Sequence, residues 1–241
     1  MTRKVIDFDW INTEGAKDYV NALFNKNGSR KQFGLLEKPS LKPDQSISYV
    51  KYKLFLCGNS CTGKTSTLAN LLGQDAEKVS PNTPGMNIGR VYWPVRIVST
   101  GKIIYLNLQF WDAGDQACKT FEHVVPTCME QVDCLLLCFS MTDRSSFNDV
   151  VATSNQLCSV ASKGPLKVIV ATKMDQCIKS DISDQEIVQI SEQIEAYALK
   201  ICNVLEKNRF NEITYFLNNL SNYLILRDEN NRLRKNTESS N

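Results

Sequence analysis

The chain has 241 residues, of which 42% are hydrophobic and 22% are charged, and this composition excludes a wholly disordered protein. Lys and Arg total 28 against 26 for Asp and Glu, and from residue 51 onward the two signs balance at 20 each, which argues against a nucleic-acid-coating surface. No apolar run approaches the ~20 residues that span a bilayer. The nine scattered cysteines contain no C-x-x-C pair, so we expect reduced thiols in a cytoplasmic protein.

The pattern along the chain divides it into three segments. Residues 1–49 have mixed charge, two prolines and one short amphipathic stretch, which is typical of an extension. From 50 to 226, short apolar runs alternate with helix-compatible segments, which predicts an α/β domain with a parallel sheet. Residues 227–241 are polar, and we expect a solvated tail there.

Six apolar runs are expected to form the strands of this sheet. They lie at 52–57, 90–98, 103–111, 134–140, 168–172 and, more weakly, 201–204. The second and third flank Ser99-Thr100-Gly101, a turn signal that predicts one antiparallel pair at the edge. Cys134 and Cys138 lie four residues apart in the fourth run, so both should point into the core on the same face.

The intervening segments are expected to form helices at 64–72, 118–131, 145–160, 184–199 and 211–224. Pro126 should break or restart the second helix. The last helix has apolar residues at three- and four-residue steps, and these form one stripe that can pack on a sheet. The strands and helices together predict a mostly parallel six-stranded sheet with helices on both faces.

The segment after the first strand, Gly58-Asn59-Ser60-Cys61-Thr62-Gly63-Lys64-Thr65, satisfies the phosphate-loop pattern G-x-x-x-x-G-K-[ST] and opens a helix. Its glycines allow backbone N–H groups to converge on a phosphate, and the helix N-terminus adds positive charge. Lys64 should bind the β and γ phosphates, and Thr65 should ligate Mg²⁺. The residues expected to contact nucleotide here are Gly58, Ser60, Cys61, Thr62, Gly63, Lys64, Thr65 and Ser66.

The tetrapeptide Thr172-Lys173-Met174-Asp175 follows the fifth strand and matches [NT]-K-x-D. In this pattern the carboxylate accepts hydrogen bonds from the N1–H and 2-amino groups of guanine, and adenine offers neither donor at those positions. Leaving a charged acceptor without its buried donors costs ~2 kcal/mol or more. Thr172, Lys173 and Asp175 therefore predict GTP and GDP as ligands, and they disfavour an ATP-using kinase or ATPase on the same phosphate loop.

With these two motifs, the chain resembles the Ras-like small GTPases over about residues 50–226. The resemblance implies that Thr83, eighteen residues after Thr65, closes on Mg²⁺ and the γ-phosphate. It also implies that Asp112, at the end of the third strand, holds Mg²⁺ through water. The metal ligands expected from this resemblance are therefore Thr65, Thr83 and Asp112.

The segment Asp112-Ala113-Gly114-Asp115-Gln116 departs from the family pattern D-x-x-G-Gln, in which the glycine amide contacts the γ-phosphate and the Gln orients the attacking water. Aligned without a gap, Gln116 keeps the catalytic place and Asp115 replaces the glycine. Aligned on Gly114, which then contacts the γ-phosphate, Asp115 takes the catalytic place. Either alignment puts a carboxylate near the phosphate, so we expect slow hydrolysis.

Two further departures concern the nucleotide pocket. Cys61 stands where the loop often has glycine, so the backbone there must suit a side chain. The S-A-K element that completes the guanine site in this family is not evident, and counting back from the last helix places residues 203–206 there. We therefore expect reduced affinity for the base.

Three short segments narrow the resemblance to small GTPases that are subunits of ciliogenesis and planar polarity effector complexes. They are residues 33–39, 92–94 and 110–114. This resemblance implies a GTP-dependent switch with partners of the Inturned and Fuzzy kind at the ciliary base, or alternatively a structural subunit that stays bound to GTP. Phe33, Leu35 and Leu36 could instead simply cover an apolar patch. No C-terminal cysteine is present, so we expect no direct lipid anchor.

Overall fold

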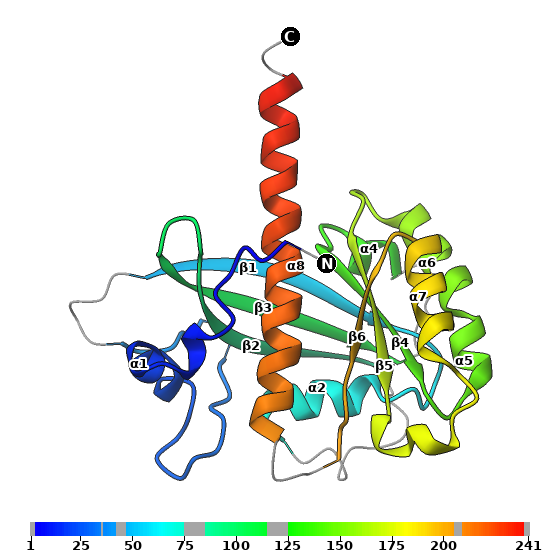
Figure 1. Ribbon diagram of the computed structural model, residues 1–241, viewed down its shortest axis with the longest axis horizontal. Coiled ribbons are helices and arrows are strands. Elements are labelled where there is room, and N and C mark those ends of the chain that lie inside the picture. The colour runs from blue at the N-terminus through cyan, green and yellow to red at the C-terminus, as the bar shows by residue number, and fades with distance from the viewer. Residues whose placement is uncertain are drawn as a thin grey trace.

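The computed structural model describes residues 3–34, 36–41, 47–74, 85–114, 125–204 and 209–238. Within these residues, six strands form one sheet in the order β2-β3-β1-β4-β5-β6 (Figure 1). The strands are β1 (Ser48–Cys57), β2 (Met86–Arg96), β3 (Ile103–Ala113), β4 (Cys134–Ser140), β5 (Leu166–Thr172) and β6 (Tyr197–Lys200). Neighbouring strands are parallel except β2 and β3, which are antiparallel. The predicted mostly parallel sheet with one antiparallel edge pair is confirmed.

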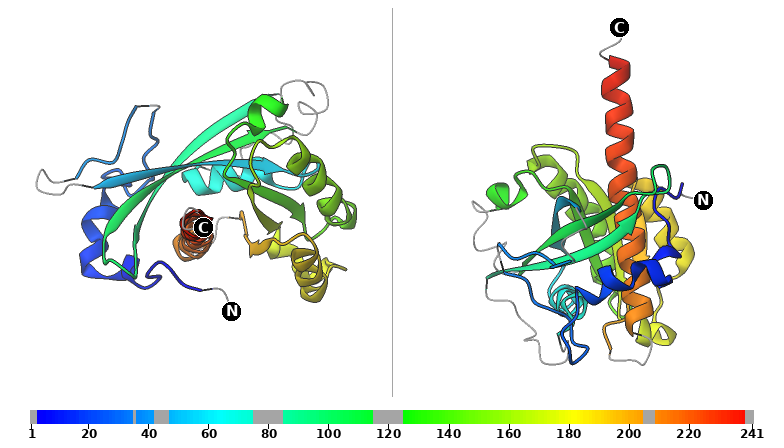
Figure 2. Two further views of the ribbon diagram at one scale, coloured as in Figure 1. Left: turned by 90° about the horizontal axis from the view of Figure 1, so that it is seen from above. Right: turned by 90° about the vertical axis from the view of Figure 1, so that its left-hand side faces the viewer.

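Helices cover both faces of this sheet. They are η1 (Trp10–Asn12), η2 (Glu14–Ala16), α1 (Lys17–Asn21), α2 (Lys64–Leu72), α4 (Val125–Met129), α5 (Arg144–Asn148), α6 (Val150–Val160), η5 (Met174–Lys179), α7 (Asp184–Gln193) and α8 (Arg209–Glu238). α2 and α8 share one apolar core, and α4 to α7 share a second core on the opposite face. Figure 2 shows α8 end-on at one side of the sheet.

The period of two along the strands creates these two cores. In β4, the even-numbered residues pack with α2 and α8, and the odd-numbered residues pack with α4 to α7. Cys134 and Cys138 therefore lie on the same face, both fully buried, as the sequence predicts. Burial raises the pKa of both thiols, that of Cys138 to about 12, so both remain protonated at neutral pH.

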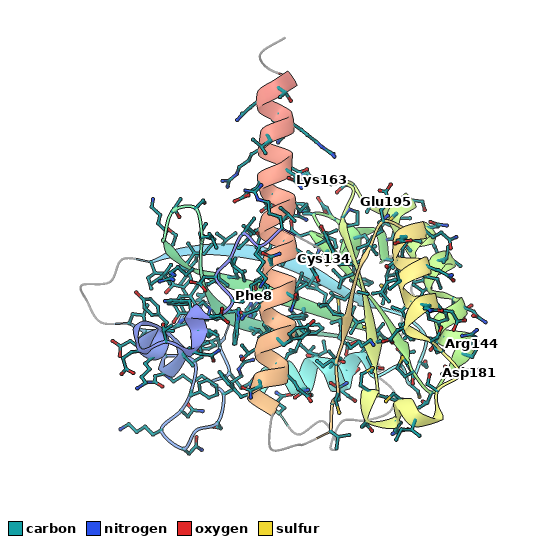
Figure 3. The ribbon with its side chains drawn as sticks, in the orientation of Figure 1. Phe8, Cys134, Arg144, Lys163, Asp181 and Glu195 are labelled. Atoms are coloured by element: carbon teal, nitrogen blue, oxygen red, sulfur yellow. The ribbon has the colours of Figure 1, made fainter. Side chains whose placement is uncertain are left out.

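Two of the predicted helices differ from the structure between β4 and β6. The predicted helix 145–160 is divided at Asp149 into α5 and α6. The prediction of a helix over 184–199 is wrong at its end, because α7 stops at Gln193 and β6 begins at Tyr197. Glu195, labelled in Figure 3, has a left-handed φ of 51°, and the amide of Ala196 donates to the Ser191 carbonyl at 2.7 Å. This geometry ends a helix as a C-terminal glycine usually does.

Other predicted boundaries shift for related reasons. The weak strand expected at 201–204 instead lies at Tyr197–Lys200. Of the predicted helix 118–131, residues 125–131 are described, and within them α4 contains Pro126 and ends at Met129, two residues before the predicted end. Residues 118–124 lie outside the described part of the chain.

The last helix extends well beyond its predicted end at Leu224. α8 continues to Glu238 and projects past the sheet (Figure 1). The predicted apolar stripe packs on the sheet, although its first residue, Phe210, is 38% exposed. The projecting turns lack that stripe, so periodicity could not reveal them. Among the described residues, no helix is both long enough and apolar enough to cross a membrane.

The N-terminal segment is built into the core beside α8. Buried Asn222 on α8 accepts a hydrogen bond from the Val5 amide (2.8 Å) and donates one to the Arg3 carbonyl (3.0 Å). On the other side, the Val98 amide donates to the Val5 carbonyl at 3.0 Å. Figure 3 shows Phe8 next to α8. The segment thus fills the space between α8 and the β2–β3 hairpin.

We predict that Asn222→Ala lowers the free energy of unfolding by about 1–3 kcal/mol, because it leaves the buried Val5 amide without its partner and also removes the bond to the Arg3 carbonyl. Urea unfolding of the full chain measures this change. Asn219→Ala is the matched control, since within the described residues the Asn219 side chain donates to the Tyr215 carbonyl of its own helix. Equal stability of the two variants would contradict the prediction.

Candidate functional site

The predicted phosphate loop lies between β1 and α2, at the carboxyl ends of the parallel strands, and two glycines allow its close packing there. A Cβ on Gly58 would lie 2.1 Å from the Cys138 carbonyl oxygen of β4, and Gly58 has φ 131°. Gly63, the N-cap of α2, has φ 84°, and a Cβ there would lie 3.3 Å from Thr172 Oγ1. Only glycine fits both positions, so these contacts fix the loop against β4 and β5.

The other predicted residues of the phosphate loop differ in their exposure. Cys61 is exposed and has a left-handed φ of 61°, so the backbone keeps a conformation that favours glycine even though a side chain is present. Ser60 is also exposed. Buried Thr62 donates its hydroxyl to the Asn59 carbonyl at 2.9 Å, and Ser66 is half-buried in α2.

Lys64 begins α2 and is the buried cation of the loop. Its Nζ donates to the carbonyl oxygens of Gly58 at 2.8 Å and Asn59 at 2.7 Å. An ammonium group has three N–H donors, and two described carbonyls take two of them in the loop, which leaves one for a phosphate oxygen as far as the described residues go. The position and charge therefore fit the predicted role of Lys64.

Asp112 lies fully buried at the end of β3, beside the start of α2. Within the described residues, neither carboxylate oxygen has a partner in full hydrogen-bond geometry, although the Thr65 hydroxyl of α2 lies near enough to act on the carboxylate as a donor. Burial raises the pKa of this carboxyl group, while the nearby Thr65 hydroxyl and Lys64 ammonium act in the opposite direction. A buried carboxylate without a full set of donors is unfavourable unless a cation compensates it. Asp112 and Thr65 thus offer the hard oxygen ligands that Mg²⁺ prefers.

The predicted base-reading residues lie at the end of β5. The buried Thr172 hydroxyl bridges the Thr62 carbonyl of the phosphate loop at 2.6 Å and the Phe139 carbonyl of β4 at 3.0 Å. Lys173 has a left-handed φ of 56°, which turns the chain into η5. Asp175 in η5 is exposed, so its carboxylate is accessible to a ligand. The structure thus brings the phosphate loop and the [NT]-K-x-D segment to one edge of the sheet.

A third segment, after β6, completes this edge. The Cys202 thiol lies 3.5 Å from Oδ1 of Asp175, and the Asn70 side chain of α2 donates to the Cys202 carbonyl at 3.1 Å. The amide of Ile201 donates to the Ala171 carbonyl at 2.9 Å and continues the ladder between β5 and β6. Cys202 and Asn203 thus lie at this edge, whereas residues 205 and 206 of the predicted element 203–206 lie outside the described part of the chain.

Three predicted residues, Thr83, Asp115 and Gln116, lie outside the described part of the chain. Gly114 is described, and its amide donates to the Gly85 carbonyl at 3.2 Å. The predictions of Mg²⁺ closure by Thr83 and of slow hydrolysis therefore stay predictions. The sequence pattern gives no sign of Asn70, and it includes Asn203 only within the range 203–206 that counting back from the last helix places at the base.

We predict that Asp112→Asn raises the Tm of the ligand-free protein by about 2–4 °C, because the change removes a buried charge. The same variant should lose the extra thermal stabilisation that Mg²⁺ gives in the presence of GDP. Thermal unfolding with and without Mg²⁺ measures both effects, and Asp181→Asn on the exposed surface is the control. A wild-type response to Mg²⁺ in Asp112→Asn would rule out this metal site.

Known proteins have sequences related to this chain. Residues 53–222 match the model of the Ras family. Ciliogenesis and planar polarity effector 2 of Xenopus tropicalis is 36% identical over 183 residues, covering 76% of this chain and 71% of the relative. The mouse protein of the same name is 34% identical over 206 residues, 85% and 78% of the two chains. Ras-related protein RabG2 of Dictyostelium discoideum is 26% identical over 140 residues, 58% and 64%.

Proposed function

The chain belongs to the Ras family of small GTPases, and on this premise we propose that it binds GTP and GDP with Mg²⁺ as a nucleotide-dependent subunit in cilium assembly. The observation that carries the proposal is the Thr172 hydroxyl bond to the Thr62 carbonyl, which holds the two recognition segments side by side. One ligand with phosphates at one end and guanine at the other spans both.

Each residue has a separate task in this proposal. Lys64 neutralises the β and γ phosphates, and the loop amides hold their oxygens. Thr65 and Asp112 would hold Mg²⁺, which would neutralise phosphate charge, and Thr83 would close over it. Asp175 accepts the two donors of the guanine edge, which makes the base, rather than the phosphates, decide selectivity.

The hydrolytic step is the weak part of this machinery. Asp115 adds a carboxylate close to the γ-phosphate, and like-charge repulsion there disfavours the closed arrangement that hydrolysis needs. A GTP-bound form would then persist and present a lasting surface to partners. Relatives are named as ciliogenesis and planar polarity effectors. We therefore propose protein partners of the Inturned and Fuzzy kind at the ciliary base, with membrane attachment through them.

A second version of this function is a structural subunit that remains bound to GTP and does not cycle. The Asp112-Ala113-Gly114-Asp115-Gln116 segment favours it, because both alignments put a carboxylate near the γ-phosphate. Partner affinity measured with the GDP form and with the GTP form distinguishes the two versions. A switch binds far more tightly in one form, whereas a structural subunit that depends on GTP only for folding binds equally in both.

We predict that Asp175→Asn weakens GDP binding at least about 30-fold and improves binding of xanthosine diphosphate. The Asn amide cannot accept from two guanine donors, but it can donate to the 2-carbonyl group of xanthine. Competition binding with both nucleotides measures the exchange of preference. Asp184→Asn, a side chain 72% exposed on α7, should leave both affinities unchanged. Unaltered guanine preference in Asp175→Asn would refute the proposed base contact.

We predict slow single-turnover GTP hydrolysis, and we expect Asp115→Gly to accelerate it by at least about tenfold. The change restores the glycine and leaves Gln116 in the catalytic place of the ungapped alignment, while it removes the like charge. Phosphate release from preloaded protein measures both rates beside an ordinary Ras-family protein. Wild-type hydrolysis as fast as that of the reference protein would contradict the prediction.

A further inference from the structure

A pair of asparagines joins α2 to the segment that follows β6. The Asn203 side-chain amide donates to Thr67 Oγ1 at 2.9 Å. The Asn70 amide donates to Oδ1 of Asn203 at 3.3 Å and to the Cys202 carbonyl at 3.1 Å. Both sides of the Asn203 amide therefore bind α2, the helix that begins at the phosphate loop.

The two α2 members of this cluster are buried. Thr67 is 1% exposed and Asn70 is 3% exposed, so their side-chain hydrogen bonds to Asn203 and Cys202 start from groups inside the protein. Asn203 also lies close to the phosphate loop, since a Cβ on Gly63 would be 3.6 Å from its Nδ2. Amide hydrogen bonds to buried groups such as Thr67 and Asn70 hold a segment in one position, because breaking them deprives groups inside the protein of a partner.

The segment held in this way lies against the guanine-reading carboxylate. The Cys202 thiol is 3.5 Å from Oδ1 of Asp175, within the range of a sulfur hydrogen bond. Burial raises the pKa of Cys202, so the group that faces the carboxylate is the neutral thiol and not a second anion. A displacement of Asn203 therefore moves the neighbour that supports Asp175.

We propose that Asn203 is a positioning residue for base recognition: with Thr67 and Asn70 it holds Cys202 against Asp175 and so aligns the Asp175 carboxylate with the guanine edge. This inference rests on the proposed guanine-nucleotide function. In this arrangement, Cys202 and Asn203 take the role of the S-A-K element, which is not evident in the sequence. Because α2 carries both Lys64 and Thr67, the same helix positions the phosphate end and the base end of the ligand.

The test compares dissociation of GDP with that of inosine diphosphate from the full chain. Inosine lacks the 2-amino group, so the ratio of the two dissociation rates reports the contact between that group and Asp175. In the wild type, inosine diphosphate should leave about tenfold faster. Asn203→Ala and the nearly isosteric Thr67→Val should bring the ratio towards one, as Asp175→Asn does. Asn219→Ala on α8 should keep the wild-type ratio.

The outcomes separate this inference from the proposed function. If Asn203→Ala and Thr67→Val accelerate release of both nucleotides equally and keep the ratio, the asparagine pair only stabilises the fold and the inference is overturned. If the wild-type ratio is already one and Asp175→Asn changes nothing, the proposed base contact itself fails. A ratio that collapses in Asp175→Asn and both cluster variants, with Tm of Thr67→Val near that of the wild type, supports the inference.

Discussion

The bond from the Thr172 hydroxyl to the Thr62 carbonyl holds the two halves of the site together. It joins segments 110 residues apart, and it is buried beneath the edge where ligands of parallel sheets bind. The absence of a side chain at Gly58 lets the phosphate loop approach the Cys138 carbonyl, so the loop sits low enough for this bond. These two contacts hold the segments that carry Lys64 and Asp175 at the same end of the sheet.

The core that contains α2, α8 and the N-terminal residues supports the end of the sheet that carries the site. α2 starts at the phosphate loop and shares one core with α8 and with the N-terminal segment, which Asn222 holds in place. The sequence pattern marks the first 49 residues as an extension. Val5 and Trp10 in this segment are each only 3% exposed, so part of it belongs to the core. Stability of the site therefore depends on residues far from the nucleotide motifs.

Short sequence patterns predict much of the fold and of the site. Contacts between residues far apart in the sequence could not be predicted from them. The phosphate loop and the [NT]-K-x-D segment are short, so their residue types alone indicate their chemistry. Glu195, rather than a glycine, takes the left-handed conformation that ends α7, so the sequence pattern extends that helix to residue 199 and places the weak last strand four residues too late, at 201–204. The bond between Asn203 and Thr67 spans 136 residues, and no period or motif signals it. The predicted last helix ends too early, at Leu224, because the projecting turns of α8 have no apolar stripe.

The most direct measurement is calorimetric titration of the nucleotide-free chain with GDP and with ADP in the presence of Mg²⁺. If one ligand contacts both Lys64 and Asp175, GDP should bind with one-to-one stoichiometry and at least about 30-fold more tightly than ADP, because ADP has the phosphates but not the guanine donors. Equal affinity for the two nucleotides, or no binding of GDP, would contradict the account.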